Sequence, residues 1–144
     1  MKTYRFLLSF LVVTFMLVSC SKEKSIERHL DRKGGKWNIL SEKSEHFTND
    51  QLVASVTVAN AGTIVFDENG NVIYTQVHDG FTEMYGGTWS NTAEEIRLII
   101  DSEVLIYVIK DESRKKMTIE HTDSYTDFEG NKEVFVQTLE LEKE

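Results

Sequence analysis

The spacing of hydrophobic and polar residues changes twice along this chain of 144 residues. Residues 6–18 are almost continuously apolar, residues 21–33 are mostly charged, and the rest of the chain alternates between apolar and polar positions. Alternation with a period of two is typical of strands that bury one face. We therefore predict a leader over residues 1–19, a tether with a short helix over 20–33, and one β domain over 34–144.

The alternating region predicts eight or nine short antiparallel strands. Asn69-Gly70, between two alternating runs, is a strong hairpin signal. No long helical segment separates the strands, so parallel crossovers are not expected. The pattern favours an all-β fold, either an up-and-down barrel of about eight strands or a sandwich. The expected strands are about 36–47, 52–58, 63–66, 72–77, 83–90, 94–100, 103–110, 115–122 and 133–142.

Within the charged segment, Ile26 and Leu30 are the only large apolar residues. Their spacing of four places them on one face of a helix, which we expect over about Ser25–Arg32. Gly34-Gly35 would end this helix before the first strand.

Residues 96–100 and 104–109 differ from the other strands because they are apolar on both faces. Strands of this kind are usually covered on both sides. Either the domain covers the outer face itself, for example with the short helix, or a partner protein of the cell envelope covers it. In the second case, binding would use outward residues such as Ile99 and Leu105.

The first residues have the pattern of a secretory signal. Lys2 and Arg5 precede an apolar run of 13 residues, Phe6–Val18. A membrane-spanning helix needs about 20 apolar residues, whereas signal sequences use about 7–15. This pattern predicts a signal peptide over residues 1–19.

Leu17-Val18-Ser19-Cys20 directly follows this pattern and resembles the lipobox of bacterial lipoproteins. The resemblance implies cleavage before Cys20, a diacylglycerol on its thiol, and an acyl chain such as palmitate on its new amine. Two or more acyl chains hold a protein stably on a membrane, whereas one binds marginally. Ser21, and not Asp, follows Cys20. This resembles the sorting pattern of lipoproteins that are sent to the outer membrane.

Two Gly-x-Trp motifs, Gly35-Lys36-Trp37 and Gly87-Thr88-Trp89, flank the predicted hairpin. Together with the lipobox and the length, this order resembles bacterial lipocalin-like lipoproteins. The resemblance implies a lipocalin-like barrel without enzymatic activity that binds a small apolar or amphipathic ligand. Lipocalins usually have a C-terminal helix and an arginine near the last strands that packs on the first tryptophan. This sequence departs from that pattern, because Lys115 follows Arg114 and no such helix is written after Glu133.

An eight-stranded barrel encloses space for side chains or for one small ligand. Large residues such as Phe66, Tyr85 and Phe135 could fill it, which leaves two hypotheses. One is a ligand-binding cup, and the other is a filled protein-interaction or inhibitor module that acts through its outer sheet surface. The candidate ligand-binding residues are Trp37, Tyr74, Gln76, Trp89, Tyr107, His121 and Gln137.

Composition and motifs exclude several other classes. The formal net charge of −8 argues against a nucleic-acid surface, and a single cysteine leaves no internal disulfide or Cys-based zinc site. Asp67, Asn69 and Asn71 resemble the start of a calcium loop, but His78 stands where a closing Glu is needed, so we predict a plain hairpin turn. No nucleophile elbow or phosphate loop is present, and we expect no catalytic residues, metal or cofactor.

Overall fold

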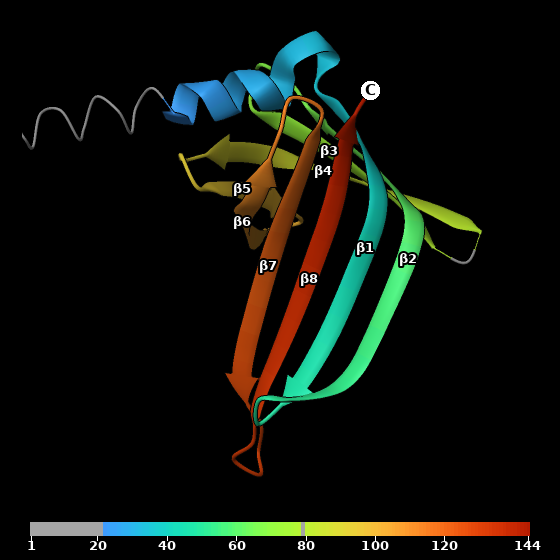
Figure 1. Cartoon of the computed structure of the whole chain (residues 1–144), viewed down its shortest axis with the longest axis vertical. Helices are drawn as coiled ribbons and strands as arrows, with labels where there is room; N and C mark the ends of the chain where they lie inside the picture. Colours follow the sequence, from blue (N-terminus) through green and yellow to red (C-terminus); the bar gives the residue numbers. More distant parts are fainter. Residues whose placement is uncertain (1–21, 79) are drawn as a thin grey trace, which may run out of the picture.

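Eight antiparallel strands form a closed barrel in the computed structural model, which describes residues 22–78 and 80–144 (Figure 1). Each strand pairs with its neighbours in sequence, and the last strand closes the barrel against the first. The predicted all-β, up-and-down barrel is confirmed. The predicted signal peptide and Cys20 lie outside the described residues. The strands are β1 Lys36–Thr48, β2 Gln51–Phe66, β3 Asn71–His78, β4 Phe81–Asn91, β5 Glu95–Ile100, β6 Glu103–Glu112, β7 Lys116–Thr126 and β8 Lys132–Lys143.

A short helix covers one end of the barrel (Figure 1). It spans residues 22–31 and continues as a 3-10 turn over Arg32–Gly34. Ile26 and Leu30 are 1% and 0% exposed and belong to the same hydrophobic core as the inward side chains of the barrel. The helix therefore seals this end, which we call the closed end.

The core fills the closed half of the barrel. Its inward side chains come from every strand and alternate with outward polar or partly exposed residues, as a pleated sheet requires. Besides Ile26 and Leu30, the core consists of Trp37, Ile39, Ala61, Ile64, Phe66, Val72, Tyr74, Trp89, Ile96, Leu98, Ile100, Tyr107, Met117, Ile119, Leu139 and Leu141.

Both Gly-x-Trp motifs are explained by close backbone contacts at the closed end. A Cβ atom on Gly35 would lie 1.7 Å from the carbonyl oxygen of Phe66, and one on Gly87 would lie 2.1 Å from that of Ile99. The two tryptophans point into the core, and their indole N–H groups donate to the carbonyls of Leu30 at 3.1 Å and Asp67 at 3.0 Å. Each motif thus combines a strand contact that only glycine permits with a buried plug.

The cation on the first tryptophan is Lys143, near the end of β8. Its Nζ lies 4.8 Å from the centroid of the Trp37 ring and donates to the carbonyls of His29 and Leu30. Arg114 lies in the turn between β6 and β7.

The opposite end of the barrel is open because its strands differ in length. β2 pairs with β3 only over Gly62–Phe66, so residues 51–61 have no neighbour on that side. Likewise, β7 pairs with β6 only as far as His121. Four neighbouring strands, β7, β8, β1 and β2, project beyond the others and form one wall of the open end (Figure 1).

The outer face of β5 and β6 differs from one of the two expectations. The short helix covers the closed end and not this face, so the expectation that the domain buries both faces of these strands is wrong. Leu105 points inward and packs against the core, whereas Ile99 points outward as expected. The exposed apolar side chains of this outer face are Ile99, Val104, Ile106 and Val108, each 39–44% exposed.

Candidate functional site

Glu42 lies inside the barrel, where the filled half meets the open half. Its side chain is buried and accepts hydrogen bonds from the side-chain amides of Gln137 at 2.7 Å and Gln76 at 3.3 Å. The hydroxyl group of Tyr107 donates to Oε1 of Gln137 at 2.7 Å. Four strands thus contribute to one polar network, and the donors to the buried carboxyl group are neutral amides.

Two buried tyrosines border this network. Burial raises the pKa of Tyr74 far above its usual range, and the nearby Glu42 raises it further. Burial and Glu42 also raise the pKa of Tyr107. The Tyr74 hydroxyl has no hydrogen-bond partner among the described residues, although such groups are normally satisfied when buried. The network therefore has an unused donor next to its carboxyl group.

A second polar cluster lies nearer the mouth of the barrel. Nε2 of His46 lies 2.5 Å from Oε2 of Glu133, and the Thr48 hydroxyl donates to the same oxygen at 2.9 Å. The ring of Phe135 stacks on that of His46 with centroids 4.2 Å apart. The ring of Tyr125 stacks on Phe135 with centroids 6.0 Å apart. These contacts fix the side chains of the wall formed by the long strands.

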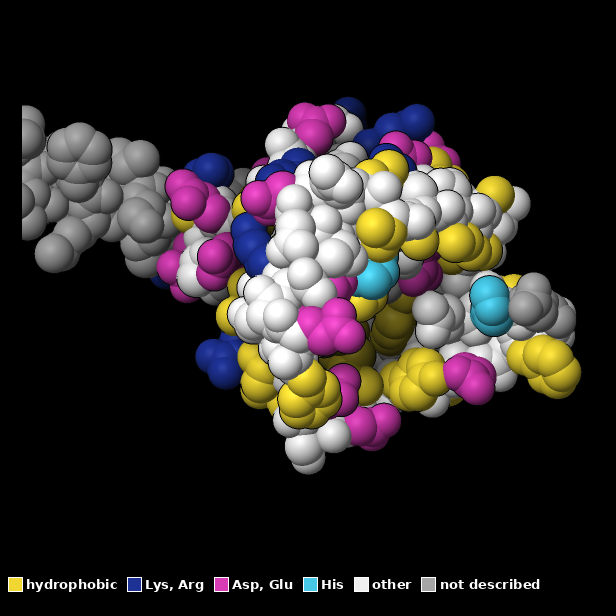
Figure 2. Space-filling model, turned by 90° about the horizontal axis from the view of Figure 1, so that it is seen from below, with side chains coloured by type: hydrophobic (Ala, Val, Ile, Leu, Met, Phe, Trp, Pro, Cys, Tyr) yellow, Lys and Arg dark blue, Asp and Glu magenta, His cyan; other side chains and the backbone are white. Residues whose placement is uncertain are grey.

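The mouth of the barrel is hollowed, with hydrophobic side chains in its depth and acidic side chains around it (Figure 2). Val58 and Val56 lie opposite Glu42 and Ser44 in the β1–β2 ladder, so they share the inward face. Phe81, on the inward face at the start of β4, is 75% exposed. The hollow therefore presents apolar surface above a polar floor.

The structure brings together five of the seven predicted ligand-binding residues. Gln76 and Gln137 donate to Glu42, Tyr107 donates to Gln137, and Tyr74 lies near Glu42. The ring of His121 lies 5.5 Å from that of Tyr107. The two tryptophans do not join them, because they are buried in the closed half.

Nδ1 of His121 lies 2.9 Å from the carbonyl oxygen of Ile106, which satisfies one side of its ring. This agrees with a histidine on the inner rim whose hydrogen bonding is met within the fold.

Glu42 is the residue that the sequence pattern missed. Alternation from Trp37 and Ile39 would place Ser41 inside and Glu42 outside. A register shift between Ile39 and Ser41 in both ladders of β1 inserts one residue and reverses the phase. The only available signal was the break in the apolar pattern after Leu40.

The residues that resemble the start of a calcium loop form a hairpin turn, and a second turn has the same hydrogen bonds. The carboxyl group of Asp67 accepts hydrogen bonds from the backbone N–H groups of Asn69 and Asn71 and from the Asn71 amide, and Asp127 does the same with Glu129 and Asn131. These bonds hold the pKa of both aspartates below the usual range. The hairpin-turn prediction for Asp67 is confirmed.

Over residues 22–78 and 80–144, no three His, Cys, Asp or Glu side chains are grouped in a way that could hold a metal ion.

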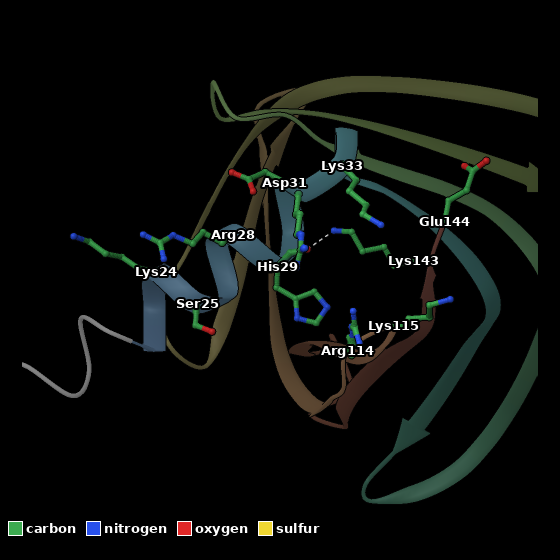
Figure 3. Close-up of a pocket in the computed structure, with 11 residues that line it drawn as sticks. Lys24, Ser25, Arg28, His29, Asp31, Lys33, Arg114, Lys115, Lys143 and Glu144 are labelled. Atoms are coloured by element: carbon green, nitrogen blue, oxygen red, sulfur yellow. Dashed lines mark hydrogen bonds between the residues drawn. The ribbon is translucent and has the colours of Figure 1, made fainter.

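A basic groove of about 830 Å³ lies on the closed end, between the helix, the β6–β7 turn and the end of β8 (Figure 3). His29, Lys33, Arg114, Lys115 and Lys143 lie around one opening, whereas Lys24 and Arg28 extend away along the helix (Figure 3). Burial lowers the pKa of Lys143; Asp31 partly offsets this, and the neighbouring basic residues add to it. The cations that line the groove are Lys24, Arg28, Arg32, Lys33, Arg114, Lys115 and Lys143.

Comparison with known proteins adds no assignment. No protein-family model and no curated protein matches this chain. Among the residues that the structure describes, no helix has the length and hydrophobicity needed to cross a bilayer.

Proposed function

We propose that this protein is a non-enzymatic lipoprotein of the bacterial envelope, held on the outer membrane by lipidated Cys20, and that its open end binds a small amphipathic ligand. The observation that carries the binding proposal is the buried network around Glu42 beneath the apolar hollow. The closed barrel and the lipobox-like sequence before residue 21 support the same interpretation.

The polarity of the hollow suggests the kind of ligand. An apolar body would cover the exposed surface of Phe81, Val56 and Phe135 at the mouth. Its polar head would reach Glu42, whose carboxyl oxygens accept hydrogen bonds, and the Tyr74 hydroxyl, which has none. A head group that donates hydrogen bonds, such as an amine, therefore fits better than a carboxylate, because burying an acid next to Glu42 costs free energy.

This specificity can be tested with three simple compounds. Nile red reports occupation of the apolar hollow, and dodecylamine and dodecanoic acid compete for it with the same chain and opposite head groups. We expect dodecylamine to displace Nile red at lower concentration than dodecanoic acid. Glu42→Gln should reduce this preference about tenfold, because hydrogen bonds to charged groups contribute about 1.5–3 kcal/mol.

Glu95→Gln is the matched control, since it removes one carboxylate from an exposed position on β5. It should leave the preference unchanged. Equal displacement by both compounds in the unmodified protein, or no Nile red binding at all, would contradict the ligand-binding proposal.

The anchor is tested separately. In cells that are fed labelled palmitate, the protein should take up the label and stay in the membrane fraction, and Cys20→Ser should abolish both. Ser21→Ala, next to the modified residue, should still be labelled. Membrane retention of Cys20→Ser at the original level would argue against lipid anchoring.

A second candidate function is protein binding through the outer face of β5 and β6. The observation that favours it is the exposure of Ile106 and its apolar neighbours there. Ile106→Lys should then weaken association with an envelope protein, or self-association in sedimentation, without lowering the melting temperature. A lower melting temperature with unchanged association would assign the residue to folding alone.

A further inference from the structure

The positive charge of this acidic protein is concentrated at one end. The whole chain has 16 lysines and arginines against 24 acids. Seven of those cations line the basic groove, and only Asp31 and Glu144 are acids among its lining residues. The rest of the chain therefore has nine cations against 22 acids. The groove is a local cationic site on a protein that is negative elsewhere.

Three of the cations at its opening have no ion-pair partner in the part of the fold that the structure describes. Within the described part of the chain, Lys33, Arg114 and Lys115 form no ion pair, and all three are exposed. Glu144, which could neutralise them, pairs with Lys36 at 2.5 Å. Like charges held together without partners destabilise a fold slightly, so an external anion would gain their full attraction.

The groove also lies beside the proposed point of attachment. Its lining begins at Lys24, and the described helix begins at residue 22. Residue 22 is two positions after Cys20, and two residue steps span at most about 7 Å in any conformation. A lipid chain on Cys20 would therefore enter the bilayer next to the groove, and the closed end would face the lipid head groups.

We propose that the basic groove binds the phosphate-bearing head groups of anionic lipids and so docks the closed end on the membrane. The identity of the membrane rests on the proposed anchoring at Cys20, but head-group binding does not require it. A soluble polyanion fits less well, because beyond the groove it would meet the excess of acids. A membrane approaches from the closed end only and leaves the acids of the open-end turns, such as Asp127 and Glu129, in water.

The test uses residues 20–144 with Cys20→Ser, which retain the helix and the whole barrel core and carry no lipid. Vesicles of equimolar phosphatidylglycerol and phosphatidylcholine should bind this protein in a flotation assay, and vesicles of phosphatidylcholine alone should not. Each Lys or Arg close to an anionic surface contributes about a fivefold factor to binding. Replacing Lys33, Arg114 and Lys115 together by Gln should thus weaken binding about 100-fold.

A control variant with the same net charge distinguishes the groove from overall charge. It replaces Lys43, Arg97 and Lys132 by Gln, three exposed cations outside the groove. This variant should bind the anionic vesicles nearly as well as the parent, and circular dichroism should show all three proteins folded. Equal losses in both variants, or equal binding to neutral vesicles, would overturn the proposal.

A final arm separates a membrane from a soluble anion. Titration with inorganic phosphate should give at most weak binding, because one phosphate lacks the many head groups of a surface. Tight phosphate binding without vesicle binding would overturn membrane docking and identify a soluble-anion site. None of these outcomes depends on Cys20 modification, so failure here is distinguishable from failure of the lipid-anchor proposal.

Discussion

Gly86 and Gly87 are neighbours in β4 with opposite surroundings. A Cβ on Gly87 would lie 2.1 Å from the Ile99 carbonyl oxygen, whereas one on Gly86 would meet no atom within 4 Å. We expect Gly87→Ala to lower the free energy of unfolding by about 1–3 kcal/mol, the usual cost of overpacking. Gly86→Ala should be neutral or slightly stabilising. Urea unfolding of the two variants measures the difference, and equal stabilities would contradict the proposed role of the second Gly-x-Trp motif.

Tyr107 links stability to alkaline pH. Burial raises its pKa above the ordinary value of 10.0, so the folded state favours the neutral hydroxyl. Its contribution to stability is complete below pH 10 and falls as the pH rises from there towards the folded pKa. Tyr107→Phe should lower the free energy of unfolding by about 1 kcal/mol at neutral pH, because the hydrogen bond to Gln137 is lost. When the pH is raised to about 11, this variant should lose less stability than the parent, because it has no hydroxyl to ionise. Urea unfolding at both pH values provides the test, and an unchanged alkaline loss would contradict it.

Individual residues were predictable where alternation was unbroken. Tyr74, Gln76, Tyr107 and Gln137, which the sequence named as candidate ligand-binding residues, lie around one interior, and their strands keep a period of two there. Glu42 was not named, because one bulged residue inverts the phase of everything after it on β1. A bulge depends on the pairing of both neighbouring strands, and the local sequence does not encode it clearly.

At the scale of elements, β2 is longer than predicted. The expected strands over 52–58 and 63–66 are one strand of 16 residues, and Asn60 and Gly62 lie between the two expected ranges. Asn60 takes a positive φ of 53° and the ladder to β1 shifts there, so these residues form a bulge. The bulge bends β2 and lets its first half project as part of the open wall. The helix, in contrast, was predicted from only two apolar residues. Their neighbours are mostly charged, so only one face of a helix could be buried.

The helix stabilises the barrel mainly through those two residues. Leu30 is fully buried, and its carbonyl accepts the Trp37 indole hydrogen bond. Leu30→Ala should therefore lower the free energy of unfolding by about 2–5 kcal/mol. Glu27→Ala, one turn earlier on the exposed face, should change it by less than about 0.5 kcal/mol. If both variants unfold at the same urea concentration, the helix does not seal the closed end.

At the scale of the whole molecule, the two ends of the barrel differ in charge and in packing. The closed end is filled and carries the basic groove, and the open end is hollow and bordered by acids (Figures 2 and 3). The sequence did not reveal the basic groove, because its cations come from three separate stretches, near residues 24–33, 114–115 and 143. Only barrel closure brings them together. If the closed end lies on the membrane, the mouth opens away from it, towards solutes.

This orientation makes a prediction that single labels can test. With Cys20 replaced by Ser, a cysteine introduced at Glu94 carries a dye on the β4–β5 turn of the closed end, outside the basic groove. A cysteine at Glu129 carries it on the β7–β8 turn of the open end. Anionic vesicles should protect the dye at residue 94 from quenching by iodide, because head groups exclude the ion there. The dye at residue 129 should stay fully quenchable, since the barrel separates it from the surface.

Neutral vesicles provide the reference, and neither dye should be protected by them, because only the phosphate-bearing surface attracts the groove. Raising the salt concentration should remove the protection at residue 94, since screening shortens the range of surface charge to about 3 Å at molar ionic strength. Protection at residue 129 instead would place the mouth against the bilayer. A ligand would then have to enter from the lipid, and the acids around the mouth would face the anionic surface that repels them.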